Sequence, residues 1–149
     1  MTLLQLLRQQ ILDYDNYNQD LINIIGYPGY PHTDCKVKDI VSFSEWISSY
    51  QTYPVIKIEG IEKLDPVKRH FNNISVKNIH LFINQKFGYS FNWHRDNINV
   101  LLYVLSGKKT LYIRDKVFEI YPKQYAIIPK GHLHKVRSID NTWALSVGF

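Results

Sequence analysis

The C-terminal half of the chain, from Ser75 onward, constrains the fold more than any other feature. It is a succession of short segments rich in β-branched and aromatic residues, separated by Gly and Pro. Short strands at regular spacing, with turn residues between them, predict an antiparallel sandwich or barrel. The expected strands cover residues 76–83, 94–105, 110–113, 117–120, 125–128, 134–137 and 142–149.

The first of these strands has two unlike faces. Alternation places Asn78, His80 and Asn84 on one face together with Phe82, whereas the other face is wholly apolar. A strand whose polar side chains lie on one face suits a position where that face lines a cavity. We therefore expect the barrel to enclose a site.

The N-terminal half mixes helical and extended patterns. Apolar residues recur at three- and four-residue spacing between Met1 and about Leu21, which predicts a helix that covers one end of the barrel. We expect a short helix over residues 41–50 and a strand over residues 54–59. A further helix is expected from Asp65, as N-cap, through Pro66 to about Phe71.

These patterns predict one mainly β domain over residues 1–149. Its fold would be a sandwich or barrel with an α-helical N-terminal cover. The cover and the first strand would occupy residues 1–72, and the barrel residues 73–149. A length of 149 residues fits a single domain of this kind.

The composition excludes several classes of protein. No apolar run approaches the ~20 residues of a membrane span, the N-terminus lacks a signal-peptide pattern, and a single cysteine excludes an intrachain disulfide. We expect a cytoplasmic protein without membrane contact. The net charge is +5, but the lysines are scattered rather than arranged in a stripe or a run. This argues against nucleic acid as the partner, while an acidic small molecule or peptide fits the charge.

The stretch HRDNINVLLYVLSGKK begins with two potential metal ligands, His94 and Asp96. We expect it to form a strand up to Leu105, followed by a turn at Ser106-Gly107. Because residues i and i+2 of a strand point the same way, the imidazole and the carboxylate are predicted to face one point. A further histidine would complete the two-histidine, one-carboxylate triad of non-haem Fe(II) sites.

The later stretch IPKGHLHKV offers two candidates for that third ligand. His134 stands at the start of a predicted strand, and we favour it over His132, which lies nearer the turn. An HxD tripeptide alone is weak evidence. The combination of HxD with a P-x-G-x-x-H turn, 40 residues after His94, is more specific because it leaves room for the intervening strands of a small barrel.

Lys109 supplies an independent indication. In the run KTLYI it shares a face with Leu111 and Ile113, so an inward orientation would bury its ammonium group. A buried lysine normally has a counter-charge, and a substrate or cosubstrate carboxylate would provide one. The alternative is a lysine at a hairpin end that reaches water.

Together these stretches resemble the JmjC oxygenases of the cupin fold. The resemblance implies a double-stranded β-helix, the jelly-roll or cupin barrel. The most similar branch includes the ribosomal oxygenases and bacterial relatives that hydroxylate protein side chains. Its members are Fe(II)- and 2-oxoglutarate-dependent dioxygenases with an HxD, a Lys or Arg fifteen residues after the His, and a later P-x-G-x-x-H turn. The resemblance is specific over residues 76–149 and suggestive over residues 38–75.

The resemblance implies particular roles for particular residues. His94, Asp96 and His134 would bind iron, and Lys109 would pair with the distal carboxylate of 2-oxoglutarate. The segment NIHL resembles the family's N-x-Y strand, so Asn78 and His80 would contact the cosubstrate, with histidine in place of tyrosine. Homodimers are common in this family, so a homodimer is a further expectation.

Alternatives remain open at this point. A cupin that binds a metal or ligand without turnover would explain the histidines but not Lys109. Another enzyme of the same fold, such as an isomerase, would not need Asp96. The substrate is a peptide or protein side chain by resemblance alone, and a free amino acid or a natural-product intermediate is the alternative. Either Val100, Leu102 and Val104 or the residues between them would face the site. Tyr89 and Trp93 would contact substrate or belong to the core.

Overall fold

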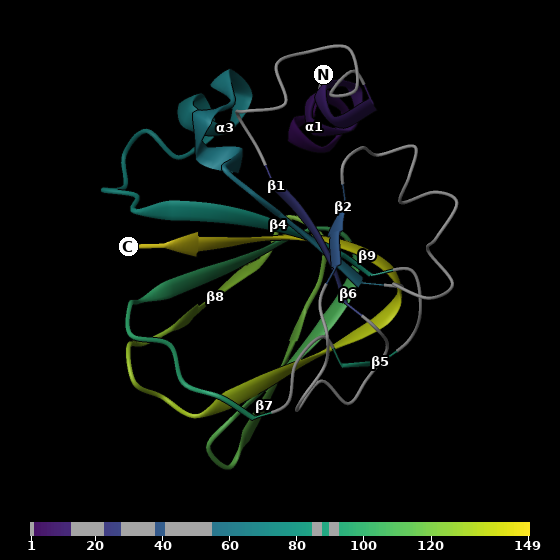
Figure 1. Ribbon diagram of the computed structural model, residues 1–149. Helices are drawn as coiled ribbons and strands as arrows, with labels where there is room; N and C mark the ends of the chain where they lie inside the picture. Colours follow the sequence, from purple (N-terminus) through teal and green to yellow (C-terminus); the bar gives the residue numbers. More distant parts are fainter. Residues whose placement is uncertain (1, 13–22, 28–37, 41–54, 85–87, 90–92) are drawn as a thin grey trace.

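The computed structural model describes residues 2–12, 23–27, 38–40, 55–84, 88–89 and 93–149 (Figure 1). Within this part of the chain, nine strands form one antiparallel sheet in the order β2-β1-β3-β4-β9-β6-β7, with β5 beside β9 and β8 beside β6. The helical elements are α1 (Leu3–Leu12), the 3-10 turn η2 (Ile61–Lys63) and α3 (Asp65–His70). The strands are β1 (Asn23–Tyr27), β2 (Lys38–Ile40), β3 (Val55–Glu59), β4 (Asn78–Asn84), β5 (Gly88–Tyr89), β6 (Val100–Ile113), β7 (Lys116–Ile120), β8 (Tyr125–Ile128) and β9 (His134–Gly148).

The sheet curls because its two longest strands bend. β6 and β9 pair from Val100↔Gly148 at one end to Ile113↔His134 at the other. Figure 1 shows β9 running along one arm of the curl, turning at its far end and returning to the C-terminus in the other arm. The result is a curled half-barrel with few helices, which confirms the predicted mainly β, cupin-like architecture with a helical cover.

The bend coincides with Gly107, and here the sequence prediction of a turn was wrong. β6 continues through this residue, with register shifts against β9 on both sides of Ser106. Gly107 has φ +76°, and an added Cβ would lie 2.5 Å from Cγ2 of Thr142. A glycine in this conformation forms a bulge that bends a strand without ending it. The sequence also predicted two separate strands, over residues 134–137 and 142–149. The structure has one continuous strand there, because β9 runs through Thr142, which lies opposite the bulge.

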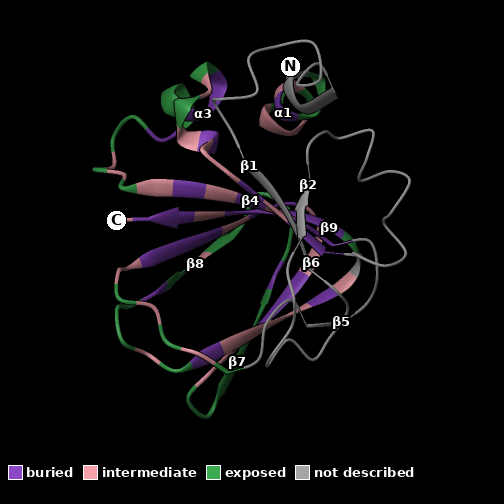
Figure 2. Ribbon diagram, viewed as in Figure 1, coloured by how far each residue is buried: buried purple, intermediate pink, exposed green. Residues whose placement is uncertain are grey.

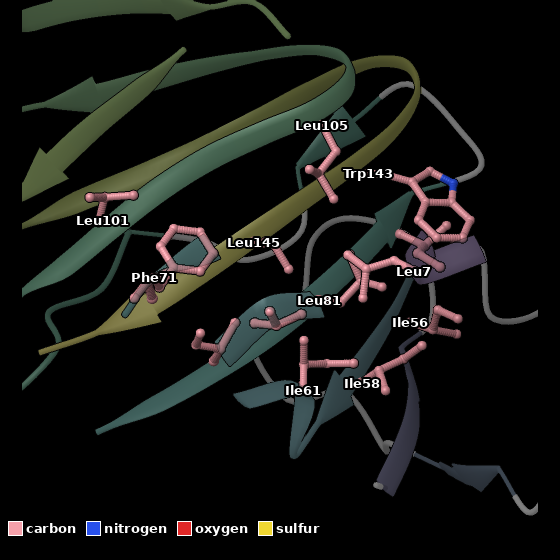
Figure 3. Packing of buried hydrophobic residues seen from close by; sticks show 14 residues of the cluster. Leu7, Ile56, Ile58, Ile61, Phe71, Leu81, Leu101, Leu105, Trp143 and Leu145 are labelled. Carbon is pink, nitrogen blue, oxygen red and sulfur yellow. The ribbon is translucent and has the colours of Figure 1, made fainter. Parts of the chain in front are cut away.

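The two faces of the sheet carry two separate apolar clusters. The inner face is defined by Val100, Leu102 and Val104, which cluster with Leu111, Ile120, Ile128 and Ala144. The outer face carries Leu101 and Leu105 and is covered by α1 and α3, with the cluster seen in Figure 3. The open question of which set faces the site is thereby answered, because Val100, Leu102 and Val104 line the inside of the curl. Figure 2 shows buried positions on β4, β6 and β9. Those of β4 alternate with partly exposed residues, and those of β6 lie on both sides of its partly exposed bend.

The N-terminal elements agree in part with the predictions. β3 confirms the strand expected over residues 54–59, and α1 confirms the start of the first helix. The rest of that helix and the helix expected over residues 41–50 lie outside the described residues. α3 begins at Asp65, but its N-cap is Leu64, whose extended backbone precedes the first turn and forms no side-chain cap. The prediction of Asp65 as N-cap was therefore wrong by one position.

Among the described residues, no helix has the length and apolar character needed to cross a membrane.

Candidate metal centre

The structure brings His94, Asp96 and His134 together. One ligand atom from each lies within 4.8 Å of the others. Nε2 of His134 is 3.3 Å from Oδ2 of Asp96, and Nε2 of His94 is 3.9 Å from Oδ1 of the same carboxylate. His134 is buried, whereas His94 and Asp96 are partly exposed. Two imidazoles and one carboxylate thus converge on a point that is accessible from one side, a donor set suited to a divalent metal with open positions.

Backbone hydrogen bonds hold these residues in place. The N–H of His94 donates to the carbonyl of His134 and the N–H of His134 donates to that of His94, each at 2.9 Å. Facing residues of such a pair project to the same side of a sheet. The N–H of Gly131 donates to the carbonyl of Asp96 at 2.9 Å.

The predicted strand from His94 to Leu105 was wrong in its first part, since β6 begins only at Val100. An isolated bridge and the Gly131 contact, rather than a continuous strand, therefore bring the HxD residues to His134.

The hydrogen bonds of His134 set its protonation. Its Nδ1 lies 2.8 Å from the carbonyl oxygen of His132. A carbonyl only accepts, so Nδ1 carries a proton, and a bound metal would take the lone pair of Nε2. Burial lowers the pKa of His134, but the hydrogen bond with Asp96 and the His132 carbonyl together raise it above its ordinary value. The hydrogen bond from His134 also lowers the pKa of Asp96. The site therefore favours positive charge between the two groups, as a bound cation provides.

Lys109 lies deeper on the inner face. Only 2% of the residue is exposed, and its ammonium donates to Oδ1 of Asn84 at 3.0 Å and to Oγ of Ser138 at 2.7 Å. Burial lowers the pKa of Lys109 to about 7. Among the described residues it forms no ion pair with a carboxylate. The alternative of a lysine that reaches water is excluded by this burial.

The inner face connects Lys109 with the metal ligands. His134, Val136 and Ser138 alternate along β9 and share one face. On the opposite strand, β6, they pair with Ile113, Leu111 and Lys109. The ammonium of Lys109 and the imidazole of His134 thus lie on the same face, separated by the Leu111–Val136 pair.

Asn78 and His80 also lie on the inner face, in the same row as Asn84. Asn78 lies against Gly148, where an added Cβ would approach Oδ1 of Asn78 to 2.4 Å. Burial and the charge of Lys57 lower the pKa of His80, and its Nδ1 is buried without a hydrogen-bond partner among the described residues. The structure places both side chains on this face without bringing either into the group formed by His94, Asp96 and His134.

The sequence analysis missed the two polar contacts of Lys109, with Ser138 and Asn84. Ser138 was not singled out, although its spacing of four from His134 in a strand signals the same face. Asn84 was assigned to a polar face but not paired with Lys109. His132 lies outside the group of three ligands, and its Nε2 is 2.6 Å from Nη2 of Arg114.

The structure shows for one of the two aromatic residues near the HxD whether it belongs to the core. Trp93 is 41% exposed and therefore does not belong to the core. The side chain of Tyr89 lies outside the described residues.

Comparison with known proteins supports the fold. A family model described as the AraC-like ligand binding domain matches residues 78–147. No curated protein sequence gives a significant match.

Among solved structures, the chain is similar to YcfD, a ribosomal oxygenase from Escherichia coli, in its complex with cobalt and 2-oxoglutarate. The identity is 14%, the TM-score is 0.68, and the match covers 100% of this chain and 44% of that chain. A second structure of Escherichia coli YcfD gives 13% identity and a TM-score of 0.69 over 86% of this chain and 41% of that chain.

A cupin superfamily protein from Desulfitobacterium hafniense is 14% identical, with a TM-score of 0.47, over 51% of this chain and 69% of that chain. The chain spans less than half the length of the ribosomal oxygenase it matches. At these identities the likeness shows a cupin-like fold.

Proposed function

We propose that this protein is an Fe(II)- and 2-oxoglutarate-dependent dioxygenase that hydroxylates a C–H bond, in a peptide or protein side chain. The single observation that carries the proposal is the buried ammonium of Lys109, which shares the inner face with His94, Asp96 and His134 and has no carboxylate partner among the described residues. A metal-binding cupin that takes no anionic ligand has no need of this costly cation.

The residues fit both absent groups. Two neutral imidazoles and a carboxylate suit Fe(II) and leave positions open for other ligands, and the Nδ1 proton of His134 is already fixed by the carbonyl of His132. The distal carboxylate of a dicarboxylic acid would supply the negative charge that pairs with the ammonium of Lys109. When bound, iron with 2-oxoglutarate and dioxygen supplies oxidative chemistry in which one oxygen atom enters succinate, carbon dioxide is released and the other atom enters the substrate as hydroxyl.

The chain's own residues prepare this site in three ways. His94, Asp96 and His134 would hold the metal at the open end of the curl. Asn84 and Ser138 fix the ammonium of Lys109 in one position, which lowers the entropic cost of pairing it with a carboxylate. Ser138 follows His134 by four residues on the same face of β9, so the ammonium that it binds lies along this face from the metal ligands. Between them, Leu111 and the inner apolar cluster exclude water.

The structural neighbours give further support. The Escherichia coli ribosomal oxygenase with a similar fold was solved with cobalt and 2-oxoglutarate. Its name is also the support for a peptide or protein substrate, and a free amino acid or a natural-product intermediate is the alternative. A second candidate function, ligand binding without turnover, is favoured by the match to an AraC-like ligand binding domain. Lys109 and Asp96 together discriminate between the two.

The test is succinate release from 2-oxoglutarate. Fe(II) and ascorbate are added under nitrogen, oxygen is admitted, and succinate is measured for the wild type, Asp96→Ala, Lys109→Met and the matched control Asp65→Ala. Asp65 is exposed at the start of α3, so its removal changes charge without touching the site. We expect succinate from the wild type and the control, none from Asp96→Ala, and a much higher 2-oxoglutarate requirement in Lys109→Met. Metal binding without any affinity for 2-oxoglutarate would reject the dioxygenase and favour the ligand-binding cupin.

A further inference from the structure

Three short segments surround the metal ligands, and we call them the metal rim: residues 93–97, 112–116 and 129–135. The first and third are joined by the His94–His134 bridge and by a hydrogen bond of 2.9 Å from Arg95 Nη1 to the carbonyl of Gly131. The second and third are joined by the Ile113–His134 pair and by the contact between Arg114 and His132. A substrate that reaches the metal ligands would therefore lie beside residues of the rim.

The rim is strongly basic. It contains five basic residues and two acidic ones. One of the acidic residues, Asp96, belongs to the group of metal ligands. Four of the basic side chains are exposed, and none of these four forms an ion pair with a carboxylate among the described residues. The basic residues are Arg95, Arg114, Lys116, Lys130 and Lys135. Much of the chain's net charge of +5 thus lies in the three segments of the rim.

Two arginines flank the turn that carries His134. Arg95 contacts Gly131 from the side of the HxD segment, and Arg114 contacts His132 from the side of β6. A guanidinium only donates, so the Nε2 of His132 accepts in this contact. Each of these contacts uses one edge of a guanidinium that has five N–H donors in a planar fork. The remaining donors are suited to bidentate binding of carboxylates.

From this distribution we infer that the substrate of the site is a peptide segment in which acidic side chains flank the residue that enters the metal site. This inference rests on the proposed function, because it names the substrate class of the same site. A substrate that presents lysine or arginine would meet like charges on all three segments of the rim, an arrangement that disfavours binding and slows association.

The rim fits an acidic peptide better than a nucleic acid. Its cations come from three segments around an opening and do not follow one strand, as a phosphate backbone requires. The exposed aromatic ring of the rim, Trp93, is also covered on one side. Nζ of Lys135 lies 5.2 Å from the centroid of Trp93 and 5.6 Å from that of Tyr112. A lysine that occupies the faces of both rings competes with the base stacking on which single-stranded nucleic acids depend.

The test measures binding by fluorescence anisotropy with the full chain. The probes are fluorescein-labelled Ser-Gly peptides of equal length in which alternate residues are Glu, Gln or Lys, together with oligo(dT) of equal charge. Each is titrated with and without Mn²⁺ and 2-oxoglutarate under nitrogen, so that no turnover is needed. The variants are Lys130→Glu and Arg114→Glu. Lys68→Glu is the matched control, since Lys68 is exposed on α3, outside the rim.

We expect the Glu peptide to bind about tenfold more tightly than the Gln peptide at low salt, with the difference falling as salt rises. The Lys peptide should not bind. Lys130→Glu should weaken the Glu peptide severalfold and allow the Lys peptide to bind, whereas Lys68→Glu should change neither. Lys130 keeps the inference testable if Arg114→Glu fails to fold.

Equal affinity for the three peptides, or tighter binding of the Lys peptide, would overturn the inference. Tighter binding of oligo(dT) that also depends on Lys130 would replace the peptide with a nucleic acid. Binding of the Glu peptide to the rim without any metal or 2-oxoglutarate affinity would reject the proposed function alone, so the two failures are distinguishable.

Discussion

The two faces of β4 differ in what they contribute to the molecule. On the outer face, Ile79, Leu81 and Ile83 are all buried against apolar neighbours from α1, α3 and β3. On the inner face the same strand presents polar side chains, of which Asn84 is buried with Lys109. The outer face resembles an ordinary core, whereas the inner face buries polar groups that reduce stability when they are unpaired. One strand thus stabilises the fold on one side and holds the site on the other.

This difference extends to the neighbouring strands. On β4 and β9 the inner face includes two buried polar atoms, Nδ1 of His80 and Oγ1 of Thr142, without partners among the described residues. Such groups are typical of a site that completes its hydrogen bonds with a ligand. Separate substitutions on the two faces should therefore have opposite consequences for stability and ligand binding.

The largest effect on stability is expected on the outer face. Leu81 is fully buried, and Leu81→Ala should lower the free energy of unfolding by about 2–5 kcal/mol through lost burial and a residual cavity. Urea denaturation measures this change. Ile127→Ala is the matched control, because Ile127 is 52% exposed, and it should change stability by less than about 0.5 kcal/mol. Metal affinity per folded molecule should be the same in both variants, and a loss of affinity in Leu81→Ala would show that the two faces are not independent.

The second effect concerns the metal ligands. Mn²⁺ at 100 times its dissociation constant should stabilise the wild type by about 2.7 kcal/mol, because it binds the folded state alone. Asp96→Ala should lose this stabilisation, since it removes the carboxylate that lies within 3.9 Å of both imidazoles. Thermal unfolding with and without Mn²⁺ gives the measurement, and chelation by EDTA should reverse the wild-type shift. A full shift in Asp96→Ala would exclude this carboxylate as a ligand.

The third effect concerns Lys109 and pH. The pKa of Lys109 is about 7 in the folded protein, below the ~10.4 of an unfolded lysine. Between these values the unfolded chain binds more protons, so stability should rise with pH, by at most about 1.4 kcal/mol per pH unit. Lys109→Met should remove this slope and be at least as stable as the wild type near neutral pH, while losing affinity for 2-oxoglutarate.

Urea titrations at several pH values between 7 and 10 compare the two proteins. An identical slope in the wild type and Lys109→Met would assign the pH dependence to other groups. For the ligand the sign is opposite, because a dicarboxylate requires the protonated amine, so 2-oxoglutarate affinity should fall as the pH rises above 7.

Short sequence patterns predicted individual strands and candidate ligands, but they did not predict which strands pair. The alternation in residues 76–83 predicts β4 and its two faces, and the HxD and P-x-G-x-x-H spacings single out three residues that the structure brings together. Gly107 was misjudged because glycine signals a turn and a bulge alike. The partners of Lys109 were not predictable, because Asn84 and Ser138 reach it through the pairing of β4, β9 and β6, which no local pattern specifies.

The smallest effect is expected at the start of α3, where the sequence and the structure disagree. Asp65 is the first residue of α3 and follows the N-cap, Leu64, so Asp65→Ala should cost less than about 0.5 kcal/mol rather than the ~1 kcal/mol of a lost N-cap. In contrast, Oε2 of Glu62 accepts a hydrogen bond of 3.1 Å from the backbone N–H of Ile79. Glu62→Ala should therefore cost about 1–3 kcal/mol, because it leaves the backbone N–H of Ile79 unpaired at the start of β4. Urea denaturation of both variants tests the order, and a larger loss in Asp65→Ala would restore that residue as the cap. The carboxylate of Glu62 thus adds a polar link between the helical cover and β4 to the apolar packing of the outer face.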